Sequence, residues 1–117
     1  MAEAWPTELR LDPDKRTLTV AFDDGQSFAL PAELLRVLSP SAEVQGHSEA
    51  QRVTVAGKKN VRIVRIEPVG NYAARIVFDD GHDTGLFVWD YLRTLGEHRE
   101  ARWQAYLADL AAKKLTR

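Results

Sequence analysis

The chain has 117 residues, of which 44% are hydrophobic and 28% are charged, so we expect a single globular domain over residues 1–117 with one modest core. Sixteen Lys and Arg side chains against seventeen Asp and Glu give a net charge of -1, which argues against nucleic acid or an anionic membrane as the partner. The sequence contains no cysteine, which excludes disulfides, thiolate catalysis and metal sites with Cys ligands from this chain.

Targeting signals are not evident in the sequence. The first residues, Met1 to Pro6, lack the basic flank and apolar stretch of a secretory signal. No run approaches the roughly 18 consecutive apolar residues that a membrane-spanning helix needs. We therefore expect a soluble, cytoplasmic protein without a membrane partner.

The first third of the chain reads as strands, tight turns and one short helix. The turn sequence Asp12-Pro13-Asp14-Lys15 separates the predicted strands Glu8–Leu11 and Thr17–Phe22. Asp24-Gly25 then follows the second strand, and Asp-Gly between alternating apolar residues predicts a type I′ hairpin turn with positive φ at both central residues. A helix over Pro31–Leu38 follows, with proline in its favoured first turn.

The middle of the chain, Ser39 to Asn60, is rich in glycine, proline and polar residues. It predicts a long loop with at most a short strand over Arg52–Val55. His47 and Glu49 in this loop, together with His82 or His98, match the ligand pattern of non-haem iron oxygenases. Because His-x-Glu is common by chance, we favour ordinary loop residues.

The second half of the chain repeats the pattern of the first. Phe22-Asp23-Asp24-Gly25 recurs as Phe78-Asp79-Asp80-Gly81, 56 positions later, and Leu35-Arg36-Val37-Leu38 recurs as Leu92-Arg93-Thr94-Leu95, 57 positions later. We expect each copy to form a strand, a turn, a strand and a short helix. Duplication is favoured over chance, although two similar hairpins would give the same pattern.

Further elements complete the second half. Gly70-Asn71 predicts a turn between strands Val61–Pro68 and Tyr72–Phe78, and the residues of 61–66 predict a strand partly covered on both faces. A helix is expected over Phe87–Leu95, stopped by Gly96. The predicted fold is therefore α+β, an antiparallel sheet of about five to seven strands built from two hairpin–helix units, with a C-terminal amphipathic helix.

The C-terminal helix is expected from Glu97 onward. Its apolar side chains recur at helical spacing: Trp103, Tyr106, Leu107, Leu110 and Ala111. We expect this stripe to fold back on the sheet, because a domain this small needs it for its own core. A helix that binds a partner is the alternative.

Two groups of residues are candidates for a ligand or partner site. His82 lies between Asp80 and Asp83, which suits either one arm of a metal site or a hydrogen-bonded turn histidine. Tyr72, Trp89 and Arg93 would form a small-ligand pocket with His82 if all four converged, and would otherwise pack in the core and its rim. No nucleophile, phosphate loop or other catalytic arrangement is recognisable.

A basic run lies just before and within the first strand of the second half: Arg52, Lys58, Lys59, Arg62 and Arg65. Such a run suits RNA or an acidic protein, or it protects an exposed strand from edge-to-edge pairing. The balanced net charge favours the second interpretation.

Several segments resemble a known family: Leu35–Val44, Glu67–Ala73, Phe78–Leu86 and Trp89–Leu92. They are similar to the gamma-butyrobetaine hydroxylase-like N-terminal domain family, in its small stand-alone bacterial form, from about Leu9 to Leu110. The resemblance implies a compact antiparallel sheet with helices. It also implies a module found on hydroxylases of carnitine synthesis and on some iron–sulfur assembly ATPases.

The resemblance also implies which residues stand at a zinc site of the hydroxylases. In this sequence Ser39, Ser41 and Val44 occupy the positions of three cysteine ligands, and only His82 remains. We therefore expect no zinc and no other cofactor. The oxygenase barrel of the hydroxylases is absent from this chain, so their reaction is not expected either.

These observations favour a non-catalytic protein-interaction or docking module. We expect it to form a homo-oligomer or to bind a protein partner, such as an iron–sulfur assembly or metabolic enzyme. The alternative is a small metal- or ligand-binding protein that uses the turn of Asp80, His82 and Asp83.

Overall fold

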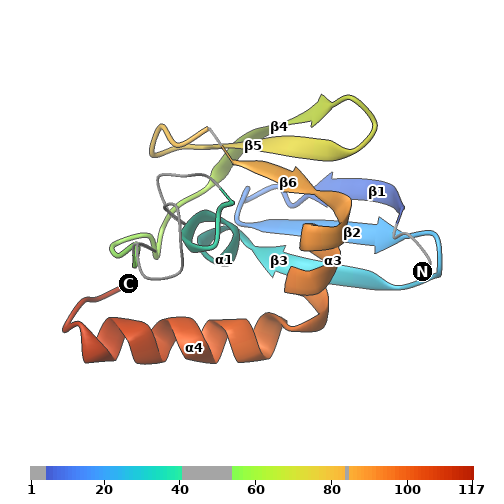
Figure 1. Ribbon diagram of the computed structural model, residues 1–117. Coiled ribbons are helices and arrows are strands. Elements are labelled where there is room, and N and C mark those ends of the chain that lie inside the picture. Colours follow the sequence, from blue (N-terminus) through green and yellow to red (C-terminus); the bar gives the residue numbers. More distant parts are fainter. Residues whose placement is uncertain (1–4, 41–53, 84) are drawn as a thin grey trace.

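The computed structural model describes residues 5–40, 54–83 and 85–117 (Figure 1). Within these ranges the elements are, in chain order, β1 (Pro6–Leu11), β2 (Thr17–Phe22), β3 (Ser27–Pro31), α1 (Ala32–Val37), β4 (Ile63–Val69), β5 (Ala73–Phe78), β6 (Leu86–Val88), α3 (Trp89–Glu97) and α4 (Arg99–Ala112). The predicted α+β class is confirmed. No helix in these ranges is long and apolar enough to span a membrane.

The strands divide into two antiparallel sheets. The first has the order β1-β2-β3 and the second has the order β4-β5-β6, so each sheet is a meander of neighbours in sequence. A helix follows each sheet directly, α1 after β3 and α3 after β6. The six strands of the described ranges lie within the predicted number.

The two Phe-Asp-Asp-Gly segments form equivalent turns. The amide of Phe22 donates to the carbonyl of Gln26 and Gly25 donates to Phe22, while Phe78 and Gly81 make the same two bonds in the second turn. Only the glycines have positive φ, 87° at Gly25 and 90° at Gly81. The predicted type I′ turn is therefore wrong: three residues, the last of them glycine, connect the strands.

The core lies between the sheets and around α1. Strands of both sheets and the helices α1, α3 and α4 contribute apolar side chains that are almost fully buried, among them Leu18, Val20, Leu30, Leu34, Leu35, Ile63, Ile76, Phe78, Phe87, Leu92 and Leu95. Figure 1 shows α1 in the middle of the molecule, with the β4–β5–β6 sheet on one side and α4 on the other. The prediction that α4 supplies core residues holds for Tyr106 and Leu110, which are buried.

Several element boundaries differ from those predicted. The segment 86–88 is a strand, and the helix begins only at Trp89 because Val88 keeps extended backbone angles. Gly96 lies inside α3 and does not stop it. A β-carbon there would come within 2.5 Å of Phe28 Cγ, so glycine serves close packing at this position.

The predicted partial coverage of both faces of the strand after residue 60 holds for Ile63, which is buried, and for Ile66, which is partly buried. β4 is an edge strand with a bulge between Ile63 and Arg65, and Val64 is exposed there. In the loop before it, Thr54 and Val55 form no strand, while Arg52 and Val53 lie outside the described residues.

Candidate functional site

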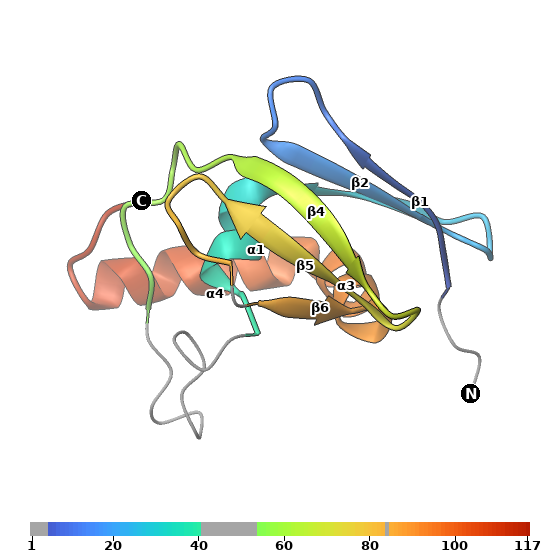
Figure 2. The same ribbon diagram turned by 90° about the horizontal axis from the view of Figure 1, so that it is seen from above.

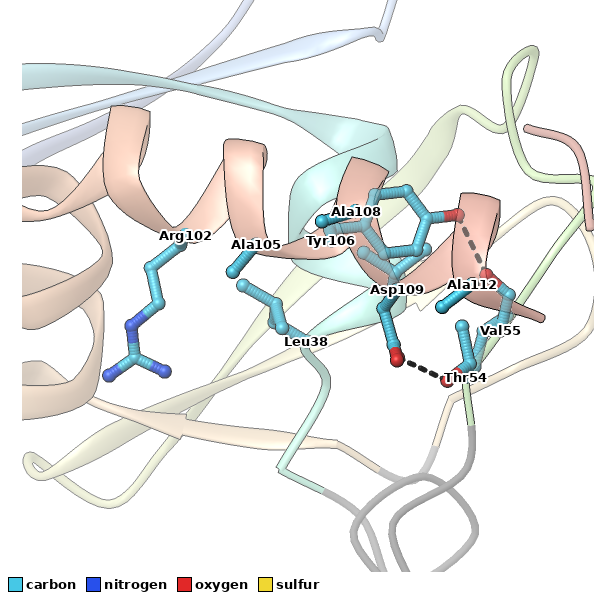
Figure 3. Close-up of a pocket in the computed structure, with 10 residues that line it drawn as sticks. Leu38, Thr54, Val55, Arg102, Ala105, Tyr106, Ala108, Asp109 and Ala112 are labelled. Atoms are coloured by element: carbon cyan, nitrogen blue, oxygen red, sulfur yellow. Dashed lines mark hydrogen bonds between the residues drawn. The ribbon is translucent and has the colours of Figure 1, made fainter.

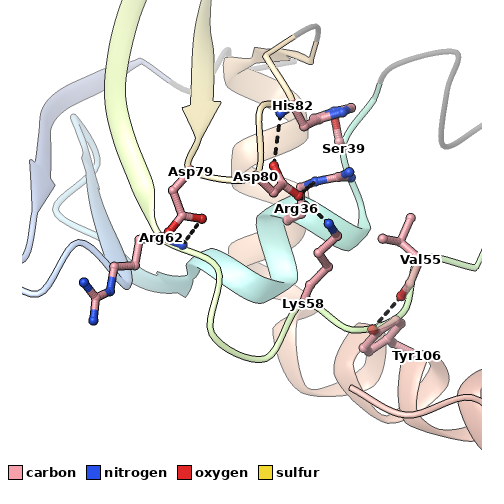
Figure 4. Close-up of polar contacts among 9 residues, drawn as sticks. All are labelled: Arg36, Ser39, Val55, Lys58, Arg62, Asp79, Asp80, His82 and Tyr106. Atoms are coloured by element: carbon pink, nitrogen blue, oxygen red, sulfur yellow. Dashed lines mark hydrogen bonds and ion pairs between the residues drawn. The ribbon is translucent and has the colours of Figure 1, made fainter.

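Asp80 is the centre of a polar cluster at the β5–β6 turn (Figure 4). Its carboxylate accepts hydrogen bonds from Arg36 Nε at 2.7 Å and from the backbone amide of His82 at 3.0 Å, and it lies 2.6 Å from Lys58 Nζ. The carboxylate therefore joins α1, the segment before β4 and its own turn. Its oxygens are used in this structure to hold three parts of the chain together.

The surroundings of Asp80 favour its charged form. Burial by itself would raise the pKa of this carboxyl, but the hydrogen bonds from Lys58, the His82 amide and Arg36 outweigh burial and lower the pKa to about 2. Asp80 thus remains ionised well below neutral pH, as a fixed partner of two cations.

Ser39 and His82 form a buried pair beside this cluster. Ser39 Oγ lies 2.9 Å from His82 Nε2, and both side chains are shielded from solvent. Phe78 packs near the imidazole, with ring centroids 6.1 Å apart. Gly85 also packs closely against the pair, because a β-carbon there would collide with Ser39 Oγ. The pair is thus enclosed by the chain, which favours the predicted role of His82 as a hydrogen-bonded turn histidine.

Replacing Ser39 with alanine is expected to lower the free energy of unfolding by about 1 kcal/mol, because a buried hydrogen bond to His82 is lost. Chemical denaturation at neutral pH measures the change. The matched control is Ser27→Ala, since Ser27 is exposed on β3 and its loss should leave stability unchanged. Equal effects in the two variants would contradict the role given to the pair.

The other predicted site residues lie in separate places. Asp83 lies 3.6 Å from Arg75 on the second sheet, and Arg93 binds Asp24 at 2.8 Å. Arg93 also lies over the rings of Phe22 and Phe28. Arg93 is therefore held at the first hairpin, whereas His82 is paired with Ser39 at the second.

Tyr72 and Trp89 lie together at the far end of the β4–β5 hairpin. Trp89 Nε1 donates to the carbonyl of Asn71, and the backbone amide of Trp89 donates to the carbonyl of Tyr72. Trp89 packs partly against the core, whereas Tyr72 is exposed. Trp89 therefore joins the start of α3 to the backbone of the hairpin, at Asn71 and Tyr72.

Zinc does not fit the residues at the positions that the resemblance assigns to it. Ser39 offers a neutral hydroxyl that is already bonded to His82, and zinc in a structural site requires four strong ligands. Ser41 and Val44 lie outside the described residues. In the part of the chain that the structure describes, no group of three or more His, Asp or Glu side chains is placed to hold a metal ion.

A groove of 570 Å³ lies between α4, the end of α1 and residues 54–55 (Figure 3). Its walls include Leu38, Ala105 and Tyr106, whose hydroxyl donates to the carbonyl of Val55. None of the six predicted site residues lines this groove.

Sequence reasoning missed the outer face of the β4–β5–β6 sheet. Here the register aligns two cross-strand rows, one of Val69, Ala73 and Val88 and one of Glu67, Arg75 and Leu86. In Figure 2 these strands lie in front of α1 and α4, and no described element lies over them. The alternation of residues along β5 was the available signal, but it does not tell which face the helices cover.

Ion pairs run across the same face. Glu67 binds Arg65 on its own strand and Arg75 on β5, and Arg75 continues to Asp83. Arg65 is the member of the predicted basic run that lies on this face. Lys58 belongs instead to the Asp80 cluster, and Arg52 lies outside the described residues.

Residues 9–93 match the family described as gamma-butyrobetaine hydroxylase-like, N-terminal. The chain belongs to this family. The match confirms the resemblance read from the sequence, and it covers the second half of β1, the other five described strands, α1 and the first part of α3. No curated protein matches the chain.

Solved structures extend the similarity of this gamma-butyrobetaine hydroxylase-like domain to α4. Two proteins studied by NMR in solution are 51% and 46% identical, with TM-scores of 0.84 and 0.86. The alignments cover 98% and 99% of this chain and 86% and 91% of those chains. A crystal structure from Acidithiobacillus ferrooxidans, of a DUF971-family protein of unknown function, is 40% identical over 78% of this chain and 91% of that chain, with a TM-score of 0.64.

Proposed function

We propose that this domain is a non-catalytic protein-interaction module and that it binds its partner through the outer face of the β4–β5–β6 sheet. One observation supports this most strongly. Three of the six large apolar side chains that are exposed in the described ranges, Val64, Leu86 and Val88, belong to this sheet. A fourth, Tyr72, stands at the end of its hairpin.

The composition of the face suits a protein partner. Val88 and Leu86 supply exposed apolar contact area at the β6 end of the two cross-strand rows, whereas Ala73 in the first row is fully buried. Arg65, Glu67, Arg75 and Asp83 lie beside this apolar area as linked ion pairs. Exposed apolar side chains with charged residues beside them are typical of a protein interface.

The alternative function, metal or small-ligand binding by the turn at residues 80–83, has less support. The carboxylate of Asp80 already binds two cations and an amide, and Asp83 faces Arg75. A ligand would first have to displace these contacts. Protein binding at the sheet requires no such rearrangement.

The class of partner that we propose is taken from the family resemblance. Related domains accompany hydroxylases and iron–sulfur assembly ATPases, so cytoplasmic enzymes of these two kinds are the first candidates. A second copy of this chain is the other candidate partner, because the same surface on two copies can form a symmetric dimer. The interaction needs no cofactor of its own.

The expected result is that Leu86→Glu combined with Val88→Glu lowers partner recovery at least about tenfold, because two exposed apolar side chains would bring charge into the interface. Affinity purification with quantitative mass spectrometry measures recovery of a stoichiometric partner, and sedimentation analysis measures self-association. Both substituted side chains are exposed to solvent, and thermal unfolding verifies that the variant folds.

Leu115→Glu is the matched control, because Leu115 is about equally exposed but lies after α4. It should leave recovery at the wild-type level. Equal recovery of the partner with the wild type, the double variant and the control would mean that the contact lies elsewhere on the domain. A monomer that recovers no stoichiometric partner in any form would contradict the proposed function itself.

A further inference from the structure

A second surface of the molecule contains a buried carboxylate whose ionic partner is supplied by the segment after α4. Glu33 lies in the first turn of α1, and its side chain is only 6% exposed. Its two oxygens accept hydrogen bonds from one guanidinium, from Arg117 Nε at 3.1 Å and from Arg117 Nη2 at 2.8 Å. This is the side-by-side geometry by which a carboxylate recognises arginine.

An aromatic ring completes the recognition of this guanidinium. Arg117 Cζ lies 5.0 Å from the ring centroid of Trp103, which comes from α4. A planar, delocalised cation satisfies both a two-point carboxylate contact and stacking on an indole, whereas a lysine ammonium satisfies neither geometry as well. Glu33 and Trp103 together therefore select a guanidinium over other cations.

The two halves of this contact differ in how firmly the fold holds them. Glu33 and Trp103 stand on helices, and Glu33 is buried among core residues of α1. The side chain of Arg117, by contrast, is 42% exposed and follows α4 on a short segment. Backbone hydrogen bonds hold this segment to the last turn of α4, from Leu115 to Leu110 among others, and Gly57 donates to the carbonyl of Thr116. The carboxylate and the indole thus belong to two helices, whereas the guanidinium is the more exposed partner and lies outside them.

Open space adjoins the bound guanidinium. A cleft of 320 Å³ is lined by Glu33, Trp103 and Arg117 together with Pro31, Leu34 and residues 99–100. Arg99, which donates to the carbonyl of Ala29, and Glu100, which accepts from Gln104, form the polar part of its lining. If Arg117 left, Glu33 would be a shielded carboxylate without its cation, which is costly, so the recess would demand a replacement.

We infer that the recess of Glu33 and Trp103 is a guanidinium-binding site, filled in this structure by Arg117 as a tethered ligand. When the segment after α4 moves away, the site accepts an arginine side chain from a peptide segment of another protein. The recess is independent of the proposed sheet surface, because α4 lies on the opposite side of α1 from that sheet (Figure 1).

The test removes the tethered ligand and adds a free one. Arg117→Gln should bind N-acetyl-arginine methylamide saturably, with a dissociation constant of about 1 to 10 mM, as expected for a single charge-assisted side-chain contact. The shift of the Trp103 indole NH signal in NMR spectra measures binding. The lysine analogue of the probe should bind at least about tenfold more weakly, because it lacks the planar fork.

Wild-type protein should show at least about a tenfold weaker response to the same probe, because the tethered guanidinium competes at high effective concentration. Lys114→Gln is the matched control: it removes a cation from the same segment but keeps Arg117, so it should behave as wild type. Adding Glu33→Gln to Arg117→Gln should abolish saturable binding.

Three results would overturn the inference. They are no saturable shift in a folded Arg117→Gln protein, equal affinity for the arginine and lysine probes, or binding that survives Glu33→Gln. If Arg117→Gln does not fold, Arg117→Lys keeps the charge and allows the same titration. The arginine probe should then displace the weaker lysine contact, and absence of displacement would count equally against the site.

Discussion

Phe78→Ala is expected to lower the free energy of unfolding by about 3 to 5 kcal/mol, because a large buried ring would be replaced by a cavity. Phe78 is 1% exposed at the end of β5, where it packs into the core beside the imidazole of His82. Its backbone also closes the Phe-Asp-Asp-Gly turn through His82 and Gly81. The loss is a large part of the stability of a domain this size.

Denaturant unfolding followed by circular dichroism measures this effect. The matched control is Val77→Ala, the preceding residue of the same strand, whose side chain lies on the outer face of the sheet. Its expected loss stays below about 1 kcal/mol. Comparable losses in the two variants would mean that the face of β5 assigned to the core is wrong.

The second large effect is expected at Asp80. Asp80→Asn should lower the free energy of unfolding at pH 7 by about 2 to 3 kcal/mol, because Arg36 and Lys58 would lose the carboxylate that binds them. The matched control is Asp24→Asn, at the equivalent position of the first turn. Asp24 pairs with Arg93 at a much more exposed site, so its loss should be smaller.

The same substitution should change the response of stability to acid. The folded-state pKa of Asp80 is depressed from 3.8 to about 2, so its contribution is fully present above pH 3.8 and is lost as the pH falls through 2. Stability of the wild type should therefore fall more steeply than that of Asp80→Asn between about pH 5 and pH 2. Parallel curves for the two proteins would contradict the assigned role of the carboxylate.

Local features of the fold could be predicted from the sequence because they depend on neighbouring residues. Asp-Gly marked both hairpins, and alternation marked the strands around them. The type of turn could not be predicted, because an aspartate such as Asp24 tolerates both negative and positive φ. Only the hydrogen bonds of Phe22 in the structure show that three residues connect the strands. Likewise, Gly96 looked like a helix stop because its contact with Phe28 is not visible in sequence.

Long-range contacts could be predicted only in part. The resemblance placed Ser39 and His82 at positions of one ligand set, and the structure does bring them together across 43 positions. No sequence pattern linked Arg93 to Asp24 or Arg117 to Glu33, because such pairs depend on how the helices pack. For the same reason, the division of six strands into two sheets and the exposure of one sheet face emerged only from the structure.

The most direct test of the account is photo-crosslinking from the sheet surface in cells. A photoreactive amino acid at position 88 should crosslink in high yield to one protein, either a defined partner or a second copy of this chain. The same group at position 115 should give no such product, since Leu115 lies outside the sheet. A dominant product from position 115 together with none from position 88 would contradict the assignment of the β4–β5–β6 face as the interaction surface.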